Sequence, residues 1–124
     1  KQDPVENYDQ AKQELKEILT DAVRERLAAD VPIGTFLSGG YDSSLVTALA
    51  QSVSDTLVKT FSIGFHEERY NEAGYAREIA SFLGCDHTEM YIGEKEMFSL
   101  VEEIPSYYDE PFADSSKIPT MLVS

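Results

Sequence analysis

The sequence predicts an α/β fold in which an open parallel sheet carries helices on both of its faces. Three observations support this prediction. Segments with apolar residues at helical spacing alternate with short apolar segments rich in branched side chains. The 124 residues are enough for one domain, and a hydrophobic content of 42% is typical of a folded core. The chain has a single cysteine, so this core must form without an internal disulfide.

A leading helix is predicted over residues 8–29, because apolar residues recur there at intervals of three and four. These residues are Ala11, Leu15, Ile18, Leu19, Ala22, Val23 and Leu27. Asn7 and Gln10 have the spacing of a capping box, which predicts that the helix begins directly after Asn7.

The next three elements are predicted as strand, helix and strand. Residues 31–37 form a short apolar run with branched side chains, which favours a buried strand. A second strand is predicted over residues 56–65, "TLVKTFSIGF". Residues 43–53 between them have helical spacing, and the apolar side chains expected to face inward are Leu45, Val46, Leu49, Ala50 and Val53.

A third helix is predicted over residues 71–83, directly before Gly84. Glycine is the residue best suited to a left-handed turn at the end of a helix, so Gly84 is expected to terminate this one. A third strand follows over residues 86–92. The alternation of strand and helix predicts parallel strands, and each crossover between them is expected to be right-handed.

A fourth helix is predicted over residues 94–104, with Pro105 ending it. Residues 109–116, "DEPFADSS", are predicted to form a loop, and a fifth helix is expected to begin after it. Three strands make a small sheet for this architecture, and the chain ends at Ser124 among apolar residues. We therefore expect the chain to be a piece of a longer protein.

The formal charge of −13 limits the partners of this chain. A surface with so many carboxylates repels phosphate backbones and anionic lipids, so neither nucleic acid nor membrane is an expected partner. An anionic ligand must be bound through local donors. No apolar run is long enough to span a bilayer, and the N-terminus does not resemble a signal peptide. A cytoplasmic location is expected.

The stretch "FLSGGYDSSLVTAL", Phe36–Leu49, places small polar residues between two apolar segments. In an open parallel sheet, ligands bind beyond the carboxyl ends of the strands, which is where this stretch falls. Adjacent glycines let the backbone N–H groups converge, and the following helix presents its free N–H groups at the same point. Hydroxyl donors are added by Ser38, Ser43 and Ser44. The pattern predicts a phosphate or pyrophosphate site.

This loop differs from a Walker A loop because it holds no lysine. It holds a carboxylate instead, Asp42. A carboxylate beside phosphates is chemically reasonable if a divalent metal lies between them, and Mg²⁺ prefers hard oxygen ligands of this kind. Asp42 is therefore the predicted metal ligand. The alternatives are that Gly39 and Gly40 form an ordinary turn and that Asp42 only caps its helix.

Other polar residues are interpreted as structural. His66 with Glu67 and Glu68 suggests a metal site, but a solvated loop is the favoured interpretation. His87 at the start of a strand is expected to be structural. Cys85, in the turn after Gly84, is expected to be a buried small residue.

Four stretches of the chain resemble the synthetase domain of the glutamine-hydrolysing asparagine synthetases, which belongs to the ATP pyrophosphatase superfamily. They run from about Val31 to Ser124 and read "VPIGTFLSGGYDSSLVTALA", "FSIGF", "YNEAGYAREIASFLGCDHTEMYI" and "YDEPFADSSKIPTMLVS". The resemblance implies the adenine nucleotide alpha hydrolase-like, or Rossmann-like, form of the predicted fold. It also implies that MgATP adenylates the side-chain carboxylate of aspartate. Ammonia from glutamine then displaces AMP to give asparagine.

The resemblance assigns ATP to a set of residues at the carboxyl ends of the first two strands. They are Phe36, Leu37, Ser38, Gly39, Gly40, Asp42, Ser43, Ser44, Ser62 and Ile63. The backbone near Ser62 and Ile63, and that of Phe36 or Leu37, is implied to flank the adenine; the alternative is that "FSIGF" is only part of the core. The loop that holds Asp109, Glu110 and Asp114 either leads into a helix that begins at Asp114, Ser115 or Ser116, or helps to shape the aspartate or metal pocket; both interpretations stay open.

The chain also departs from the family pattern. It begins at Lys1 rather than with a nucleophilic cysteine, and it lacks the second acidic glycine-rich loop of the family. The glutaminase domain and the C-terminal half of the synthetase domain are therefore expected to be absent from residues 1–124. No residue of the chain is assigned a catalytic role, and the piece alone is expected to be inactive.

Two alternatives to asparagine synthesis remain. A related amidotransferase or ligase could act on another acceptor, such as a sugar acid or a β-lactam precursor, and a non-catalytic nucleotide-binding module is the second alternative. An exposed strand edge and the apolar residues Met121, Leu122 and Val123 predict either a homodimer or marginal stability.

Overall fold

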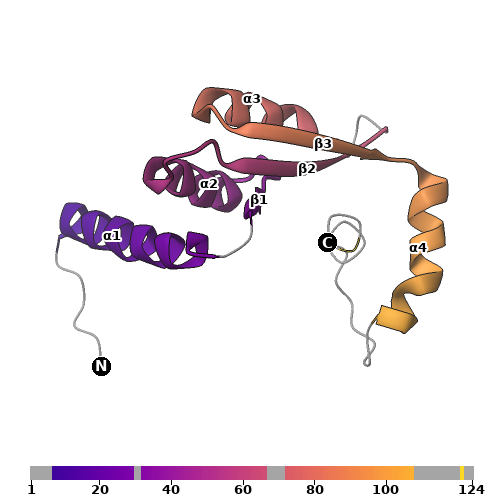
Figure 1. Ribbon diagram of the computed structural model, residues 1–124, viewed down its shortest axis with the longest axis horizontal. Helices are drawn as coiled ribbons and strands as arrows, with labels where there is room; N and C mark the ends of the chain where they lie inside the picture. The colour runs from indigo at the N-terminus through magenta and orange to yellow at the C-terminus, as the bar shows by residue number, and fades with distance from the viewer. Residues whose placement is uncertain (1–6, 30–31, 67–71, 108–120, 122–124) are drawn as a thin grey trace.

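The computed structural model of the chain describes residues 7–29, 32–66, 72–107 and 121 (Figure 1). Helices and strands alternate along the chain as the sequence predicts. The elements are α1 (Tyr8–Leu27), β1 (Gly34–Phe36), α2 (Tyr41–Val53), β2 (Lys59–Phe65), α3 (Ala73–Leu83), β3 (Asp86–Ile92) and α4 (Glu94–Tyr107). Among the described residues, no helix is both long and apolar enough to cross a membrane.

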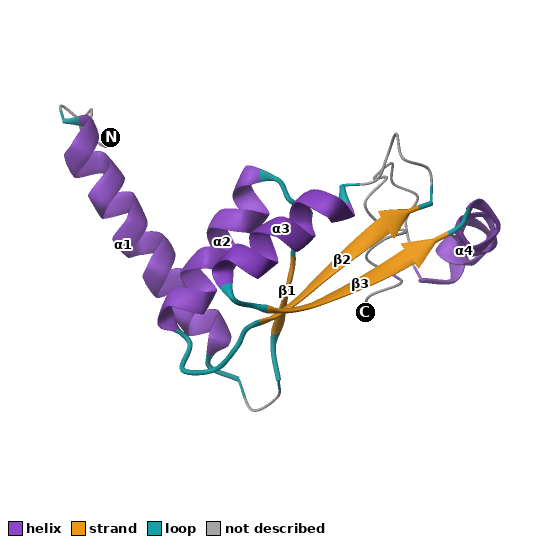
Figure 2. Cartoon of the chain, turned by 90° about the horizontal axis from the view of Figure 1, so that it is seen from above, coloured by secondary structure: helices purple, strands orange, loops and turns teal. Residues whose placement is uncertain are grey.

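The strands form an open parallel sheet in the order β1-β2-β3, which confirms the predicted α/β class with an open parallel sheet. Helices were expected on both faces, and in the described residues the two helices that pack on the sheet, α2 and α3, cover one face (Figure 2). The register aligns Phe36 with Phe61, and Ser62 with Glu89. Figure 2 shows α2 and α3 on the same side of the strands, with α4 beyond the carboxyl ends of β2 and β3. The side chains of β1, β2 and β3 that face α2 and α3 include many polar groups.

The apolar core between α3 and the sheet is small. Leu37 (1% exposed), Ala76 and Ala80 are its buried members, and Ile79 and Cys85 pack against it. Methyl groups fill most of this interface, so few large apolar side chains lock the helix to the strands. Cys85 is half-buried, and burial raises the pKa of its thiol.

The predicted N-terminal cap of α1 is confirmed. The Oδ1 atom of Asn7 accepts hydrogen bonds from the backbone N–H groups of Asp9 (3.0 Å) and Gln10 (3.4 Å). The Gln10 side chain does not complete a capping box, because its Nε2 atom donates to Glu14 Oε1 at 2.7 Å. The helix ends at Leu27, two residues before the predicted end, and it packs against α2 rather than on the sheet (Figure 1).

The first strand is shorter and less buried than predicted. β1 spans Gly34–Phe36, and Phe36 is 57% exposed, so the prediction of a uniformly buried strand is wrong. The reason is the alternation of side chains along a strand. Thr35 and Leu37 face α2 and α3, whereas Phe36 points to the opposite face of the sheet.

The inward face of α2 is also partly mispredicted. The helix begins at Tyr41, and Leu49 and Ala50 are buried as expected. Leu45 and Val46 are instead 48% and 43% exposed, and Thr47 is fully buried. The hydroxyl of Thr47 lies 3.0 Å from that of Thr35, so a hydrogen bond across the helix–sheet interface satisfies a polar residue that the apolar pattern passed over.

The later boundaries follow the prediction more closely. β2 begins at Lys59, three residues later than predicted, and β3 has the predicted bounds of residues 86–92. α4 continues through Pro105 to Tyr107, so the prediction that Pro105 ends it is wrong. Pro105 lies in the last turn of α4, so its missing N–H removes only one of the hydrogen bonds of the helix, and the remaining bonds hold the helix to Tyr107. The 109–116 loop lies outside the described residues, and of the fifth helix only Met121 is described, in helical conformation.

Gly84 terminates α3 in the predicted left-handed conformation, with φ of 70°. Its N–H donates to the carbonyl oxygen of Ser81 at 3.3 Å, and the N–H of Cys85 donates to that of Ala80 at 2.9 Å. These two bonds form a Schellman motif, which satisfies carbonyl groups at the end of the helix.

Gly84→Ala is therefore expected to lower the free energy of unfolding by about 1 kcal/mol, because an L-side chain is disfavoured at this φ. Gly74→Ala is the matched control in the same helix. A Cβ atom at Gly74 meets no atom within 4 Å, so this change is expected to stabilise the helix by up to about 1 kcal/mol. Chemical denaturation of both variants measures the difference; equal stabilities would contradict the expectation.

Candidate functional site

The glycine-rich loop begins where β1 leaves the sheet. The N–H of Leu37 donates to the carbonyl oxygen of Phe61 at 2.8 Å, which is the last rung between β1 and β2 in the described residues. Ser38, Gly39 and Gly40 then connect the carboxyl end of β1 to the N-terminus of α2. The structure thus places the loop at the edge of the sheet where open α/β folds bind ligands.

Position 39 requires glycine because of its backbone conformation and because there is no space for a side chain. Its φ is 83°, in the left-handed region that favours glycine. A Cβ atom at this position would lie 2.9 Å from Tyr75 Cβ and 3.2 Å from the backbone nitrogen of Ala76. The loop therefore rests directly on the first turn of α3, with no room for a side chain between them.

Gly40 has a different role from Gly39. Its φ is −73°, and a Cβ atom there would meet only the Ser38 hydroxyl, at 3.4 Å. Neither the backbone conformation nor the packing of the described residues requires glycine. The missing side chain instead leaves the approach to the N-terminus of α2 open.

Three hydroxyl groups converge on this loop. Ser38 Oγ and Ser43 Oγ are 3.0 Å apart, and Ser43 Oγ also accepts from the N–H of Ser38 at 3.3 Å. The hydroxyls of Ser43 and Ser44 donate to the carbonyl oxygen of Gly40, at 3.2 and 2.6 Å. These internal bonds hold the loop in shape, and hydroxyl groups can redirect their protons toward an anion.

Asp42 does not cap the helix that contains it. The N-cap residue of α2 is Gly40, with extended backbone, and no side chain forms a cap hydrogen bond there. Asp42 lies in the first turn, exposed, where its charge is favourable to the helix dipole. Its carboxylate is therefore directed at solvent beside the loop. Among the described residues, no group of three or more His, Cys, Asp or Glu side chains forms a metal site.

The predicted adenine-flanking residues lie at the carboxyl end of β1 and in the middle of β2, which continues to Phe65. Leu37 is buried, whereas Phe36 is exposed on the opposite face. In a parallel strand, alternate residues direct their backbone N–H and C=O groups to the same neighbour. The carbonyl oxygen of Phe61 accepts a hydrogen bond from the N–H of Leu37, so Phe61 directs its backbone groups toward β1. Ile63, two residues later in β2, directs its N–H and C=O to the same side, at a level where β1 has already ended. Ser62 directs its backbone toward β3, and its side chain is buried.

The remaining predicted residues are not brought to this site by the described structure. Asp109, Glu110 and Asp114 lie outside the described residues, as do Glu67 and Glu68. His66 is exposed and stacks on the ring of Tyr91, with 5.8 Å between the ring centroids.

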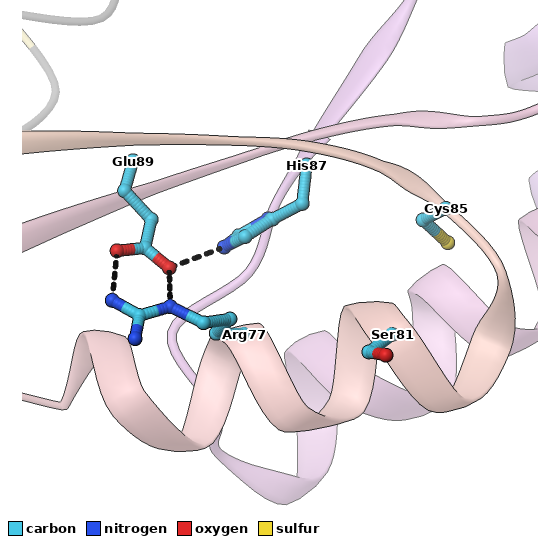
Figure 3. Close-up of a pocket in the computed structure, with 5 residues that line it drawn as sticks. All are labelled: Arg77, Ser81, Cys85, His87 and Glu89. Carbon is cyan, nitrogen blue, oxygen red and sulfur yellow. Dashed lines mark hydrogen bonds and ion pairs between the residues drawn. The ribbon is translucent and has the colours of Figure 1, made fainter.

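A polar cluster under α3 was not predicted from the sequence (Figure 3). The guanidinium of Arg77 on α3 forms two hydrogen bonds to the carboxylate of Glu89 on β3, Nε to Oε1 at 2.5 Å and Nη2 to Oε2 at 2.6 Å. The hydroxyl of Tyr91 donates to Glu89 Oε2 at 2.9 Å and accepts from Arg77 Nη2 at 3.0 Å. The hydrogen bonds from Arg77 hold the pKa of Glu89 below its usual value, and Glu89 raises the pKa of Arg77.

His87 connects this cluster to β2. Its Nδ1 atom lies 2.8 Å from the hydroxyl of Thr60, and its Nε2 atom lies 3.3 Å from that of Ser62 and 3.6 Å from Glu89 Oε1. His87 thus links buried hydroxyl groups of β2 to Glu89, in agreement with the structural role expected for it. The alternation of His87, Glu89 and Tyr91 along β3 was the available signal for a polar face. The spacing of residues in the sequence could not show that Arg77 on α3 is the partner of Glu89.

An open depression of about 470 Å³ lies beside the cluster. It is lined by Arg77, Ser81, Cys85, His87 and Glu89 (Figure 3). The carboxylate of Glu89 neutralises the guanidinium of Arg77, so this depression offers no unpaired cation for an anionic ligand. The loop at Ser38–Ser44 remains the stronger candidate for an anion site.

Comparisons with known proteins agree on one family. The family model described as asparagine synthase matches residues 14–124. A Methanocaldococcus jannaschii protein named for glutamine-hydrolysing asparagine synthetase is 41% identical over 120 residues, covering 94% of this chain and 23% of that protein. The glutamine-hydrolysing asparagine synthetase 1 of Bacillus subtilis is 34% identical over 116 residues, covering 94% of this chain and 18% of that protein. The chain thus spans about a fifth of the length of these curated relatives.

A solved structure shares the fold. The NH3-dependent NAD synthetase of Campylobacter jejuni, solved with a nitrate ion, superposes with a TM-score of 0.59 over 89% of this chain and 46% of that chain. The sequence identity is 16%, so the similarity concerns the fold.

Proposed function

Because this chain belongs to the asparagine synthase family, we propose that it is the ATP-binding part of a synthetase domain in glutamine-dependent asparagine synthesis. One observation carries the proposal. The Ser38–Ser44 loop brings a left-handed glycine, an open helix N-terminus and converging hydroxyl groups to the carboxyl end of β1.

The loop is proposed to hold the pyrophosphate portion of ATP. The first N–H groups of α2 have no partner within the helix, and the helix dipole favours negative charge at this point. Ser38 and Ser43 add hydroxyl groups 3.0 Å apart. The net charge of −13 repels anions from the protein as a whole. The local hydrogen-bond donors of the loop can still bind an anion, because they act on it at short range.

The adenine is proposed to lie beyond the carboxyl end of β1, beside Ile63 in the second half of β2. The backbone N–H and C=O of Ile63 face the side of β2 on which β1 has ended, and Phe36, Leu37 and Ser62 surround that position. Backbone groups of this kind read the edge of a base by hydrogen bonds. Main-chain recognition explains why the residues themselves show no distinctive side-chain pattern.

Asp42 fits the proposed role of a Mg²⁺ ligand. Its carboxylate is exposed beside the loop and does not cap the helix, so its oxygens are available as hard donors. When bound, Mg²⁺ would neutralise phosphate charge. Asp109, Glu110 and Asp114 are proposed to contribute to the aspartate or metal pocket.

The proposed reaction has two steps. An oxygen of the aspartate side-chain carboxylate attacks the α-phosphorus of ATP, and pyrophosphate leaves. Ammonia from glutamine then attacks the acyl carbon, and AMP leaves with the electrons of the broken C–O bond. The residues of this chain are proposed to bind and orient ATP and to hold the departing pyrophosphate. The alternative acceptors are distinguished by the following test.

The protein at its full natural length, supplied with ammonium, MgATP and aspartate, is expected to form asparagine, AMP and pyrophosphate in equal amounts. Chromatography of the nucleotides and amino acids measures AMP and asparagine, and a coupled assay measures pyrophosphate. Formation of ADP would exclude adenylation. Release of pyrophosphate that depends on a sugar acid or a β-lactam precursor, and not on aspartate, would assign the protein to another acceptor. Omitting aspartate is the matched control.

A further inference from the structure

We propose that Arg77 is a positioning residue for the loop at Ser38–Ser44, acting through α3 and its ion pair with Glu89. This inference rests on the proposed function, because it concerns how that loop is held for ATP. It assigns a role to the polar cluster of Arg77, Glu89, Tyr91 and His87, none of which is proposed to contact ATP.

The loop and α3 are in direct contact. A Cβ atom at Gly39 would lie 2.9 Å from Tyr75 Cβ and 3.2 Å from the backbone nitrogen of Ala76. Arg77 is the next residue of the helix. Any displacement of the first turns of α3 therefore either opens a gap under Gly39 or pushes the loop away from its present position.

The apolar contacts of α3 are poorly suited to preventing such a displacement. Its buried residues are Ala73, Ala76 and Ala80, whereas Tyr75 and Phe82 are 69% and 89% exposed. Alanine methyl groups make few dispersion contacts and present a shallow surface to the sheet. Burial alone thus holds α3 near the strands without strongly fixing its position along them.

The contact between Arg77 and Glu89 fixes the position of α3 along the strands. Two parallel hydrogen bonds between a planar guanidinium and a carboxylate tolerate little rotation or sliding. The hydroxyl of Tyr91 accepts a hydrogen bond from Arg77 and donates one to Glu89, so it contacts both members of the pair. The Glu89 side chain is only 14% exposed, which limits competition from water for its oxygens, whereas the Arg77 side chain is 61% exposed.

The cluster also reaches the strand proposed to flank the adenine. Glu89 is aligned with Ser62 in the sheet, and His87 lies within 3.3 Å of the Ser62 hydroxyl. One connected set of polar contacts therefore runs from α3, on which the loop rests, through β3 to β2. The arrangement fixes the relative position of the two parts of the chain proposed to bind the phosphates and the base of ATP.

The test exchanges the charges of the pair in the protein at its full natural length. Arg77→Glu and Glu89→Arg are each expected to raise the KM for ATP by about tenfold, with the KM for aspartate changed by less than about twofold, and the double variant is expected to restore most of the loss. The temperature is chosen so that circular dichroism shows every variant folded. Glu78→Gln, an exposed change on the same helix, is the matched control and is expected to leave all constants unchanged.

The outcomes separate this inference from the function on which it rests. Unchanged ATP constants in folded single variants with lower melting temperatures would overturn it, since the cluster would then only stabilise the fold. A wild-type protein without ATP-dependent activity would overturn the proposed function, and the inference with it. Should neither charge variant fold, Tyr91→Phe removes the hydroxyl and keeps the ring over Gly64; a rise in the KM for ATP is expected, and an unchanged value contradicts the inference.

Discussion

Asp42→Asn is expected to lower the rate of pyrophosphate release by about two to three orders of magnitude while the protein stays folded. The amide keeps the size of the side chain but removes its charge, so Mg²⁺ binding beside the phosphates would weaken. Folding should be little affected, because Asp42 forms no cap bond and is exposed. A coupled assay for pyrophosphate measures the rate at saturating ATP.

The matched control for Asp42 is Asp55, an exposed carboxylate in the turn that follows α2. Asp55→Asn changes the net charge equally but lies at the other end of the helix, so the rate is expected to remain near that of the unchanged protein. Excess Mg²⁺ should recover part of the activity of Asp42→Asn and leave the activity of Asp55→Asn unchanged. A rate for Asp42→Asn close to that of the control would remove Asp42 from the proposed metal site.

Gly39→Ala and Gly40→Ala are expected to have different effects, although the two glycines are adjacent. At Gly39 the new methyl group would be strained by the φ of 83° and would collide with Tyr75 Cβ, so the loop must move. The expected cost is about 2 kcal/mol of folding free energy together with loss of ATP binding. At Gly40 the backbone conformation is ordinary and space is available, so stability should change by less than about 0.5 kcal/mol.

ATP binding should nevertheless weaken in Gly40→Ala, because the methyl group would stand at the N-terminus of α2, where the phosphates are proposed to approach. Calorimetric titration with MgATP and thermal unfolding separate the two effects. A Gly40→Ala protein that binds ATP as tightly as the unchanged protein would show that ligands do not approach the loop from this side. A Gly39→Ala protein of unchanged stability would contradict the tight packing of the loop on α3.

The elements most accurately predicted from the sequence depend on local chemistry. Asn7 caps α1 and Gly84 ends α3 because each needs only its own backbone conformation and hydrogen bonds within a few residues. The strand over residues 86–92 follows directly on the helix stop at Gly84, and its predicted bounds agree with the structure. The fold class followed from the alternation of these elements, since chirality leaves few ways to connect parallel strands.

The mispredicted features depend on the packing of separate elements. An apolar run shows that a strand exists but does not show which face is covered, so residues 31–37 were predicted to form a buried strand although Phe36 is exposed. Thr47 was passed over because its burial depends on a hydroxyl partner twelve residues away, Thr35. Arg77 and Glu89 are also twelve residues apart on different elements, and neither residue type predicts its partner. The position of the loop was predictable, whereas what holds the loop in place was not.

The strand order has a consequence for how any larger sheet must be built. In the described residues, β1 is paired on one edge only, and each following strand is added on the side away from it. A further strand that paired with the other edge of β1 would extend the sheet in the opposite direction. A right-handed connection to that strand would place the connecting helix on the opposite face of the sheet, where Phe36 is exposed. The reversal would open a crevice between diverging connections beside the carboxyl end of β1. The Ser38–Ser44 loop, at the carboxyl end of β1, would then lie at a topological switch point, where open α/β sheets bind their ligands.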